Sequence, residues 1–264
     1  MIPKIIHYCW LSNDPMPGEL QRCIKSWKKH MPEYIIKKWD KKNSPLFIPY
    51  VQEAIKAKKW AFACDYIRVY ALYNEGGIYL DSDVFVKGSL DKFLINKAFT
   101  AVECYPDLRE RLLTDGIIDS DGNRKKNNKE FINGIQIQAA ILASEKGHPF
   151  FKECMEYYHD KHFINPDGTY NNSIISPFIF ANIAENYGFK FIDKLQILKD
   201  GVVIYPSSLF APNLDLISKD SIAVHCCAGS WRWMPSSPIG YCIQIIKEYI
   251  KIILFNIGLR KRKI

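Results

Sequence analysis

Residues 60–83 read WAFACDYIRVYALYNEGGIYLDSD, and the fold prediction depends on this stretch. Its first half carries apolar and aromatic residues three and four positions apart, which predicts a helix to about residue 74. The pair Gly76-Gly77 supplies the left-handed backbone that commonly ends a helix. Ile78-Tyr79-Leu80 then predicts a buried strand, and Asp81-Ser82-Asp83 follows at its carboxyl end, where open α/β sheets place their ligand sites.

The segments on both sides of this stretch continue the alternation of strands and helices. Ahead of it we expect a strand, a helix and a second strand, at residues 2–10, 19–29 and 34–39. The polar residues 105–130 predict a long loop or hairpin. Beyond them we expect a helix or strand pair at 132–144, helices at 149–159 and 177–187, and strands at 202–204 and 222–224. This order predicts an α/β fold, a mixed central sheet flanked by helices.

Size and charge limit the class of protein. With 264 residues, 48% of them hydrophobic, the chain can bury one substantial core, which we place in a single domain at residues 1–235. The formal net charge is +8, but four positive charges lie together in Arg260-Lys261-Arg262-Lys263. The rest of the chain is only mildly basic, so we expect no nucleic-acid partner.

The C-terminal residues 236–264 form a separate segment in this prediction. Residues 241–259 are amphipathic, and the charged side chains Lys247, Glu248 and Lys251 make them a poor transmembrane span. Together with the basic cluster at residues 260–263, they resemble an interfacial helix that lies on an anionic membrane surface. The alternative is a helix packed on its own domain with a solvated tail.

Localisation follows from the cysteines and from the first residues. The eight cysteines include no CxxC pair and no regular framework, which favours reduced thiols in a cytosol. The first residues contain no apolar run long enough for a signal peptide, so we expect no export. The expected location is cytoplasmic, with peripheral attachment to the inner face of the membrane if the C-terminal segment binds lipid.

The Asp-x-Asp motif carries the chemistry. Carboxylates at the end of a buried strand can hold a hard divalent cation that also binds a diphosphate. Breaking a sugar–phosphate bond places negative charge on the leaving nucleoside diphosphate, and a fixed dication stabilises that charge. On their own, Asp81 and Asp83 would more often be two solvated acids in a turn, so the function prediction depends on the surrounding residues.

The wider sequence resembles the DxD sugar-transferase family often called glycosyltransferase family 32. That family's pattern A-x-x-S-D-x-x-R, followed by L-Y-x-x-G-G-I-Y-x-D-x-D, is matched almost continuously between Ala61 and Asp83. Further landmarks are the opening residues 2–10, Ser26-Trp27 with Pro32, and residues 146–150. The resemblance covers residues 2 to about 231. The family includes capsular polysaccharide enzymes and fungal mannosyltransferases, and it is related to the glucosylating toxins.

The resemblance implies a GT-A-type fold, a nucleotide-sugar donor and transfer with retention of configuration. By similarity Asp83 is a direct metal ligand, and Asp81 contacts the metal through water or the donor. Asp65 and Arg68 hold sugar hydroxyls and the diphosphate, although residues three apart on a helix are often only a surface ion pair. Trp10 stacks on the nucleotide base by the same similarity, and its alternative is a core or rim aromatic.

A late segment resembles the family's H-x-x-x-x-S-W pattern. It places His225 at a strand end as the third metal ligand, with a core histidine as the alternative, and an imidazole would favour Mn²⁺ over Mg²⁺. Ser230 and Trp231 would close over the diphosphate. A zinc site on His225 and the two cysteines after it lacks the usual ligand spacing.

Two departures from the family pattern affect the donor. Cys64 replaces the serine before Asp65, which is nearly isosteric. Ala139 or Ala140 stands where relatives commonly have an asparagine that contacts the donor sugar, and Ser176-Pro177 replaces a common Gly-Pro. The identity of the donor sugar is therefore not predicted from these residues. A UDP-hexose is favoured as donor, with GDP-mannose as an alternative and a glycan or lipid-linked glycan of surface polysaccharide synthesis as acceptor.

Two other function classes compete with this interpretation. A haloacid dehalogenase-type phosphohydrolase also uses DxD after an apolar strand, but it needs a downstream lysine and a further acidic pair. No acidic pair is evident at a C-terminal strand end, and that motif normally lies near the N-terminus. A non-catalytic nucleotide-sugar or glycan-binding protein on the same fold is the other class. The presence of Arg68 and His225 beside the DxD argues against a decayed site.

Overall fold

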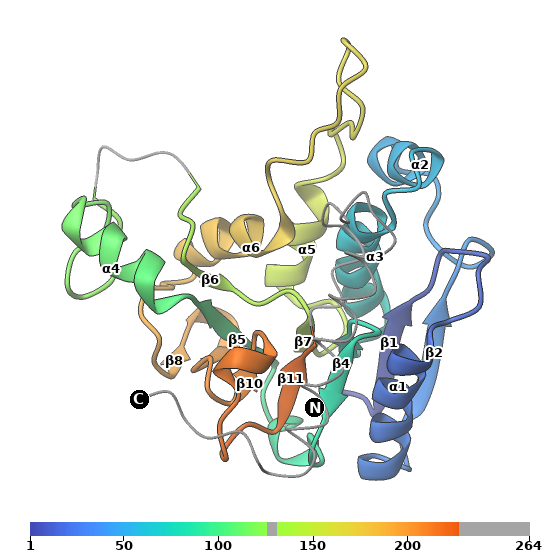
Figure 1. Cartoon of the computed structure of the whole chain (residues 1–264), viewed down its shortest axis with the longest axis horizontal. Coiled ribbons are helices and arrows are strands. Elements are labelled where there is room, and N and C mark those ends of the chain that lie inside the picture. The colour runs from blue at the N-terminus through green and yellow to red at the C-terminus, as the bar shows by residue number, and fades with distance from the viewer. Residues whose placement is uncertain (126–130, 227–264) are drawn as a thin grey trace, which may run out of the picture. The chain divides into compact units, whose positions relative to one another are not determined.

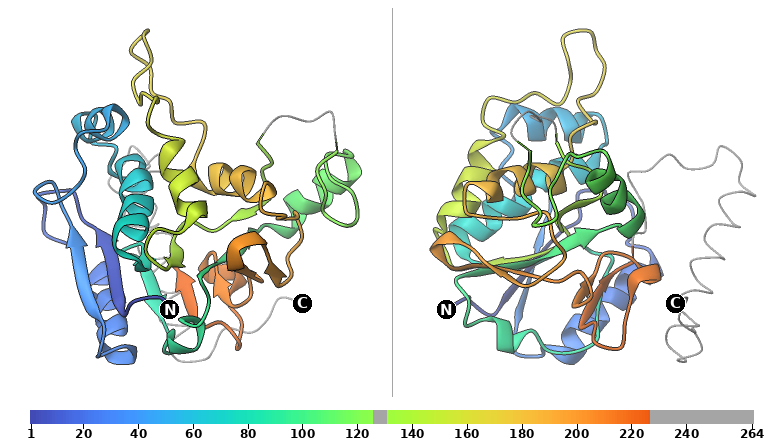
Figure 2. Two further views of the ribbon diagram at one scale, coloured as in Figure 1. Left: turned by 180° about the vertical axis from the view of Figure 1, so that it is seen from behind. Right: turned by 90° about the vertical axis from the view of Figure 1, so that its left-hand side faces the viewer.

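The computed structural model describes residues 1–125 and 131–226. The predicted α/β architecture is confirmed: a mixed sheet has helices on both faces (Figures 1 and 2). Its strand order is β2-β1-β3-β7-β5-β9-β8, with β6 paired to β5. These strands are β1 (Ile5–Cys9), β2 (Ile35–Trp39), β3 (Gly77–Leu80), β5 (Ala98–Cys104), β6 (Ile135–Ile137), β7 (Ile141–Ser144), β8 (Gln196–Ile197) and β9 (Val202–Tyr205).

A second, three-stranded sheet lies beside the site. It has the order β10-β11-β4, formed by β4 (Val84–Val86), β10 (Phe210–Ala211) and β11 (Ala223–His225). The helices are α1 (Gly18–His30), α2 (Pro49–Lys56), α3 (Trp60–Glu75), α4 (Pro106–Thr114), α5 (Pro149–Glu156) and α6 (Ser176–Glu185). Short 3-10 helices lie at Asp91–Phe93, Lys199–Gly201 and Leu214–Leu216.

The core divides into two layers because successive strand residues point to opposite faces of the sheet. In β3, Tyr79 packs in one apolar cluster with α3, α5 and α6, while Ile78 and Leu80 pack in the other cluster. The second cluster contains Trp27 of α1 and residues of the three-stranded sheet. Figure 2 shows α1 and that sheet on the side opposite to α3, α5 and α6. The strand is therefore buried on both faces, as its unbroken apolar run predicts.

Strand directions bring the chemical residues to one edge. β2, β1 and β3 are parallel, and β7 is antiparallel to both β3 and β5. Parallel strands end at the same edge of a sheet, so the loops that follow β1, β2 and β3 meet there. The chain continues from β3 through Asp81-Ser82-Asp83 into β4, which joins the large sheet to the small one.

One sequence prediction is wrong in part. Residues 105–130 were expected to form a loop or hairpin, but α4 begins directly after Tyr105 with Pro106 at its first turn. The part after α4 is hairpin-like, with an antiparallel bridge between Ile118 and Arg124. No residue of α4 is fully buried. A helix that buries no face needs no apolar repeat in its sequence, and such a repeat is the signal by which a helix is predicted.

The predictions for the C-terminal segment concern residues outside the described part of the chain. The described residues 1–125 and 131–226 belong to one compact unit. The predicted boundary at residue 235 and the amphipathic segment 236–264 therefore stay predictions. No helix in the described part of the chain is long and apolar enough to cross a membrane. All six cysteines in that part are free thiols: Cys9, Cys23, Cys64, Cys104, Cys154 and Cys226.

We predict that Gly77→Ala destabilises the protein by about 1–3 kcal/mol, the usual range for a strained backbone position. Gly77 has φ of +106°, and an added Cβ would lie 2.7 Å from the carbonyl oxygen of Ile5. Gly18→Ala is the matched control, since its Cβ would meet no atom within 4 Å. Urea unfolding of both variants measures the effect, and equal stabilities would contradict the prediction.

Candidate active site

The DxD turn is held by backbone hydrogen bonds. Asp81 follows β3 directly, and its N–H donates to the carbonyl of Ala140 at 2.9 Å. The carbonyl of Asp81 accepts from the N–H of Val84 at 2.9 Å, which closes the turn into β4. Both carboxylates are therefore placed by main-chain pairing, with side-chain exposures of 24% for Asp81 and 14% for Asp83. They are partly open to a ligand without being fully solvated.

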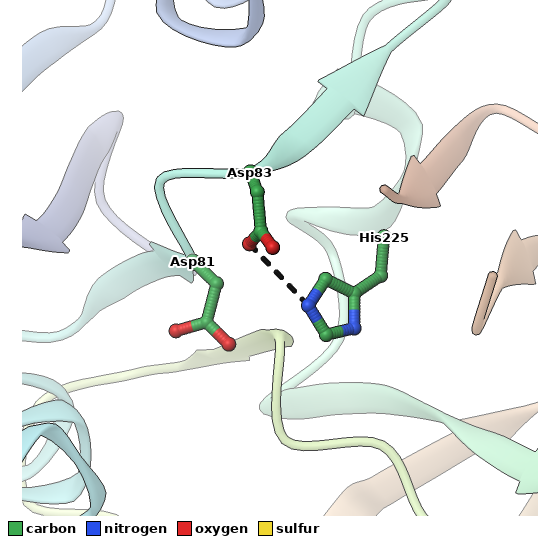
Figure 3. Close-up of side chains that lie close together, drawn as sticks. All are labelled: Asp81, Asp83 and His225. Atoms are coloured by element: carbon green, nitrogen blue, oxygen red, sulfur yellow. Dashed lines mark ion pairs between the residues drawn. The ribbon is translucent and has the colours of Figure 1, made fainter. Parts of the chain in front are cut away.

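His225 reaches this turn from the second sheet. β11 pairs antiparallel with β4, with His225 opposite Val84. The N–H of Cys226 donates to the Asp83 carbonyl at 2.9 Å, so the end of β11 is fixed to the turn. His225 Nε2 lies 3.3 Å from Asp83 Oδ1 (Figure 3). The structure thus brings together residues that lie 142 positions apart in sequence.

Asp81, Asp83 and His225 fit a divalent metal. One ligand atom from each lies within 4.8 Å of the others. Carboxylate oxygens suit Mg²⁺ and Mn²⁺, and an added imidazole nitrogen favours Mn²⁺. Figure 3 shows Asp81 and Asp83 at the two ends of the turn, with His225 reaching toward Asp83 from β11. Their geometry is compatible with the predicted ligand set.

Arg68 joins the helix to the strand end. Its guanidinium lies 3.0 Å from Asp65 Oδ1 and 3.5 Å from Asp81 Oδ1. It also donates to the carbonyl of Ala139 at 2.7 Å and lies over the Tyr79 ring, 5.1 Å from its centroid. Burial alone would lower the pKa of Arg68. The opposing effects of Asp81, Tyr79 and Asp65 are larger together, so the pKa lies well above its usual value. Arg68 and Asp65 therefore form a buried ion pair. The alternative prediction, an ordinary surface ion pair, is wrong.

Asp65 is nearly buried between two partners. Its Oδ1 accepts a hydrogen bond from the Ser176 hydroxyl at 2.8 Å as well as facing Arg68. Burial raises the pKa of Asp65 to about 6, while the charge of Arg68 and the Ser176 hydrogen bond act in the opposite direction. The carboxylate is therefore mostly ionised at neutral pH and mostly protonated at about pH 5.

Tyr79 and Ser176 also contact the acidic residues of the site, although no role was predicted for either. The Tyr79 hydroxyl donates to Asp81 Oδ1 at 2.9 Å, which orients that carboxylate. Tyr79 stands two residues before Asp81 on one strand, so the two-residue period could have indicated a shared face. Ser176 appeared only as a departure from Gly-Pro, and its contact with Asp65 spans 111 positions, which no local pattern signals.

The alanines act through their backbone. Where relatives commonly present an asparagine side chain, Ala139 and Ala140 present carbonyls to Arg68 and to the N–H of Asp81. Cys64 lies beside Cys9, whose hydrogen bond, together with burial, raises the pKa of the Cys64 thiol. These contacts hold α3, β3 and the residues before β7 together around Asp81.

The remaining predicted residues are not joined to this cluster by the described contacts. Trp10 directly follows β1, at the edge of the sheet where β3 also ends. Its N–H donates to Trp39, and its indole nitrogen donates to the carbonyl of Asp14 at 3.0 Å. Its stacking on a base stays a prediction. Ser230 and Trp231 lie outside the described residues.

Comparison with known proteins supports a glycosyltransferase. Residues 17–100 match the family described as glycosyltransferase sugar-binding region containing DXD motif. A protein of Acanthamoeba polyphaga mimivirus, named as an uncharacterized glycosyltransferase, is 26% identical over 193 residues, which cover 65% of this chain and 76% of the relative. The matched family region includes Asp65, Arg68, Asp81 and Asp83.

Several solved structures are similar at a low level. PaToxG glycosyltransferase is 16% identical and matches 70% of this chain and 68% of its own, with a TM-score of 0.44. The galactosyltransferase LgtC, solved with donor and acceptor sugar analogues, is 14% identical over 92% and 94%, with a TM-score of 0.44. GlyE of Streptococcus pneumoniae TIGR4 is 10% identical over 98% and 65%, with a TM-score of 0.44.

We predict that Asp65 makes the free energy of unfolding depend on pH. Its pKa is about 6 in the folded chain against an ordinary value of 3.8, so the folded state binds this proton more tightly than the unfolded state. Its contribution to stability is therefore greatest at low pH and is lost as the pH rises from about 4 to about 6. Across that window the wild type should lose up to about 3 kcal/mol relative to Asp65→Asn.

Urea unfolding of both proteins between pH 4 and pH 7.5 measures this difference. Asp115→Asn, at an exposed carboxylate after α4, is the control and should track the wild type at every pH. A difference between wild type and Asp65→Asn that stays constant over the range would contradict the buried titration of Asp65.

Proposed function

We propose that the chain is a metal-dependent, retaining glycosyltransferase of the GT-A type. It would transfer a hexose from a nucleotide sugar, preferably a UDP-hexose, to a glycan or lipid-linked glycan. The observation that carries the proposal is the convergence of Asp81, Asp83 and His225 within 4.8 Å, next to the buried Asp65–Arg68 pair. The matched DXD sugar-binding region and the mimivirus relative support the coarser class.

The side chains divide the work between the phosphates and the sugar. Asp81, Asp83 and His225 would hold Mn²⁺ or Mg²⁺, which when bound stabilises the negative charge that develops on the leaving diphosphate. Arg68 and the Tyr79 hydroxyl orient Asp81, so this ligand is positioned before the donor arrives. Asp65, fixed by Arg68 and Ser176, would accept hydrogen bonds from donor-sugar hydroxyls.

The rest of the donor would lie along the same sheet edge. Trp10, at the end of β1, would stack on the nucleotide base, a contact that suits any base. Ser230 and Trp231 would contact the diphosphate. The acceptor hydroxyl would attack from the face that the leaving group occupies, with a β-phosphate oxygen taking its proton. In this mechanism the protein supplies no covalent nucleophile, and configuration is retained.

We predict that Asp83→Ala strongly lowers metal-dependent donor hydrolysis. Wild type and variant are assayed with UDP- and GDP-sugars, with and without Mn²⁺, by nucleotide release and thermal shift. Loss of one metal ligand should lower turnover by about 100-fold or more, as loss of one electrostatic contact to a transition state commonly does. The exposed Asp115→Ala is the control and should retain full turnover.

The same assay separates the competing classes. Binding of a nucleotide sugar without turnover by wild type would indicate a non-catalytic binding protein. Release of inorganic phosphate from phosphate monoesters, with no response to any nucleotide sugar, would indicate a phosphohydrolase. Either result would refute the transferase proposal.

We further propose that the enzyme is cytoplasmic and peripheral on the inner face of the membrane, where it builds surface polysaccharide such as capsule. The basis is the sequence of residues 236–264, with its amphipathic pattern and the cluster at residues 260–263. Each lysine or arginine near an anionic surface contributes about 1 kcal/mol to binding.

We predict that a chain ending at Ser237 loses its binding to phosphatidylserine vesicles. Cosedimentation at low and high salt, with neutral phosphatidylcholine vesicles as control, measures the partition. Binding of the full chain should weaken by roughly 10-fold or more at high salt because the attraction is screened. Equal partition of the full and shortened chains would remove the membrane proposal and leave the transferase proposal standing.

A further inference from the structure

The Ser176 hydroxyl and the Arg68 guanidinium meet on one oxygen of Asp65. Ser176 donates a hydrogen bond to Asp65 Oδ1 at 2.8 Å, and Arg68 Nη2 lies 3.0 Å from the same atom. An ionised carboxylate has about four acceptor positions, two on each oxygen. Both positions on Oδ1 are therefore filled by the protein itself.

Oδ2 is the oxygen of Asp65 that remains for a ligand. Among residues 1–125 and 131–226, no group donates a hydrogen bond to this atom. The Asp65 side chain is only 10% exposed, so water replaces such a donor only in part. Buried polar atoms of proteins normally have a partner, and one left open beside a site is available to a ligand.

The Asp65 carboxylate lies close to the DxD turn. The nitrogen Arg68 Nη2 that contacts Asp65 also lies 3.5 Å from Asp81 Oδ1. One nitrogen therefore separates Asp65 from a carboxylate of the proposed metal site. A sugar joined to a metal-bound diphosphate would bring its hydroxyls near Asp65.

Ser176 is held in position by the packing of α6. It is the first residue of that helix and is 2% exposed, and Pro177 after it has a fixed backbone φ. The next residues of α6 bury Ile179 and Phe180 in the apolar cluster that also contains α3. A hydroxyl on such a rigid element fixes the orientation of the carboxylate that it contacts.

We propose that Ser176 is a positioning residue for recognition of the donor sugar. By filling Oδ1 of Asp65, its hydroxyl leaves Oδ2, in one fixed direction, as the acceptor for a donor-sugar hydroxyl. A single oriented oxygen distinguishes an equatorial hydroxyl from an axial or a missing one better than a carboxylate that can rotate. The identification of this sugar as the donor rests on the proposed function.

Ser176→Ala tests the role because it removes the hydroxyl and keeps Asp65. Calorimetry with Mn²⁺ measures binding of UDP-glucose, UDP-galactose, UDP-N-acetylglucosamine, GDP-mannose, UDP and GDP to the full chain. The variant should bind the preferred nucleotide sugar roughly 5- to 10-fold more weakly, about the effect of one hydrogen bond. It should bind the matching nucleoside diphosphate as wild type does, because that ligand has no sugar. In donor hydrolysis the loss should appear in KM, with kcat changed less than about twofold.

Monodeoxy analogues of the preferred nucleotide sugar identify the hydroxyl that Asp65 binds. One of them should bind wild type about 10-fold or more weakly than the parent ligand, as expected for a lost hydrogen bond to a charged group. In Ser176→Ala this difference should shrink, since the parent ligand no longer meets an oriented acceptor. Ser176→Cys keeps the size of the side chain but has a weak donor, so it should behave like Ser176→Ala.

Ser221→Ala is the matched control. The Ser221 hydroxyl donates to the carbonyl of Ser208 at 2.7 Å, and the residue is 3% exposed, so this variant also loses a buried hydrogen bond. Both alanine variants should lower Tm, but Ser221→Ala should keep the wild-type affinity and selectivity for nucleotide sugars. A merely structural role of Ser176 would make the two variants alike.

The outcomes separate this inference from the proposed function. Equal affinity of wild type and Ser176→Ala for the nucleotide sugar would overturn the inference, even if wild type hydrolyses the donor. Equal weakening of the nucleotide sugar and the nucleoside diphosphate would also overturn it, because the change would then affect the whole site. The expected loss, without donor hydrolysis by wild type, would support the positioning role and refute the transferase. Failure of every nucleotide sugar to bind wild type would refute both.

Discussion

The buried Arg68 guanidinium is the interaction on which the rest of the site depends. A cation taken out of water needs opposite charge and hydrogen-bond acceptors around it. Asp65 on the same helix and Asp81 at the end of β3 supply the charge, and the carbonyl of Ala139 supplies an acceptor. Three separate segments must therefore reach their native positions together. The same contacts therefore fix both the packing of α3 on the sheet and the positions of the carboxylates.

This arrangement also sets the charge that the site offers to a ligand. Asp65, Asp81 and Asp83 with Arg68 carry a formal charge of −2 when all are ionised, which one divalent cation balances. Since the pKa of Asp65 is about 6, this charge decreases toward −1 in mildly acidic solution. Asp81 is shared between Arg68 and the proposed metal position.

The sequence predicted the parts of the structure whose causes are local. The helix of residues 60–75, the glycine pair and the strand before Asp81 each have a short-range pattern, and all three were located to within a residue or two. The proximity of His225 to the DxD turn came only from the family resemblance, because it depends on pairing of β11 with β4. The Ser176–Asp65 contact left no signal at all, since a serine before a proline is typical of any helix start. Long-range side-chain contacts were therefore the part of the structure that local sequence patterns did not predict.

The segment between α5 and α6, residues 157–175, shows how a distant part of the chain is anchored to the site. Ser176, directly after it, donates a hydrogen bond to Asp65, and its middle is held by Glu53 of α2. The residues between these anchors are mostly polar and exposed. Substitutions among them leave Arg68 in place, because its position is set by burial between the helix and the sheet. The Asp65 carboxylate is therefore the point where this exposed segment meets the buried helix–sheet layer.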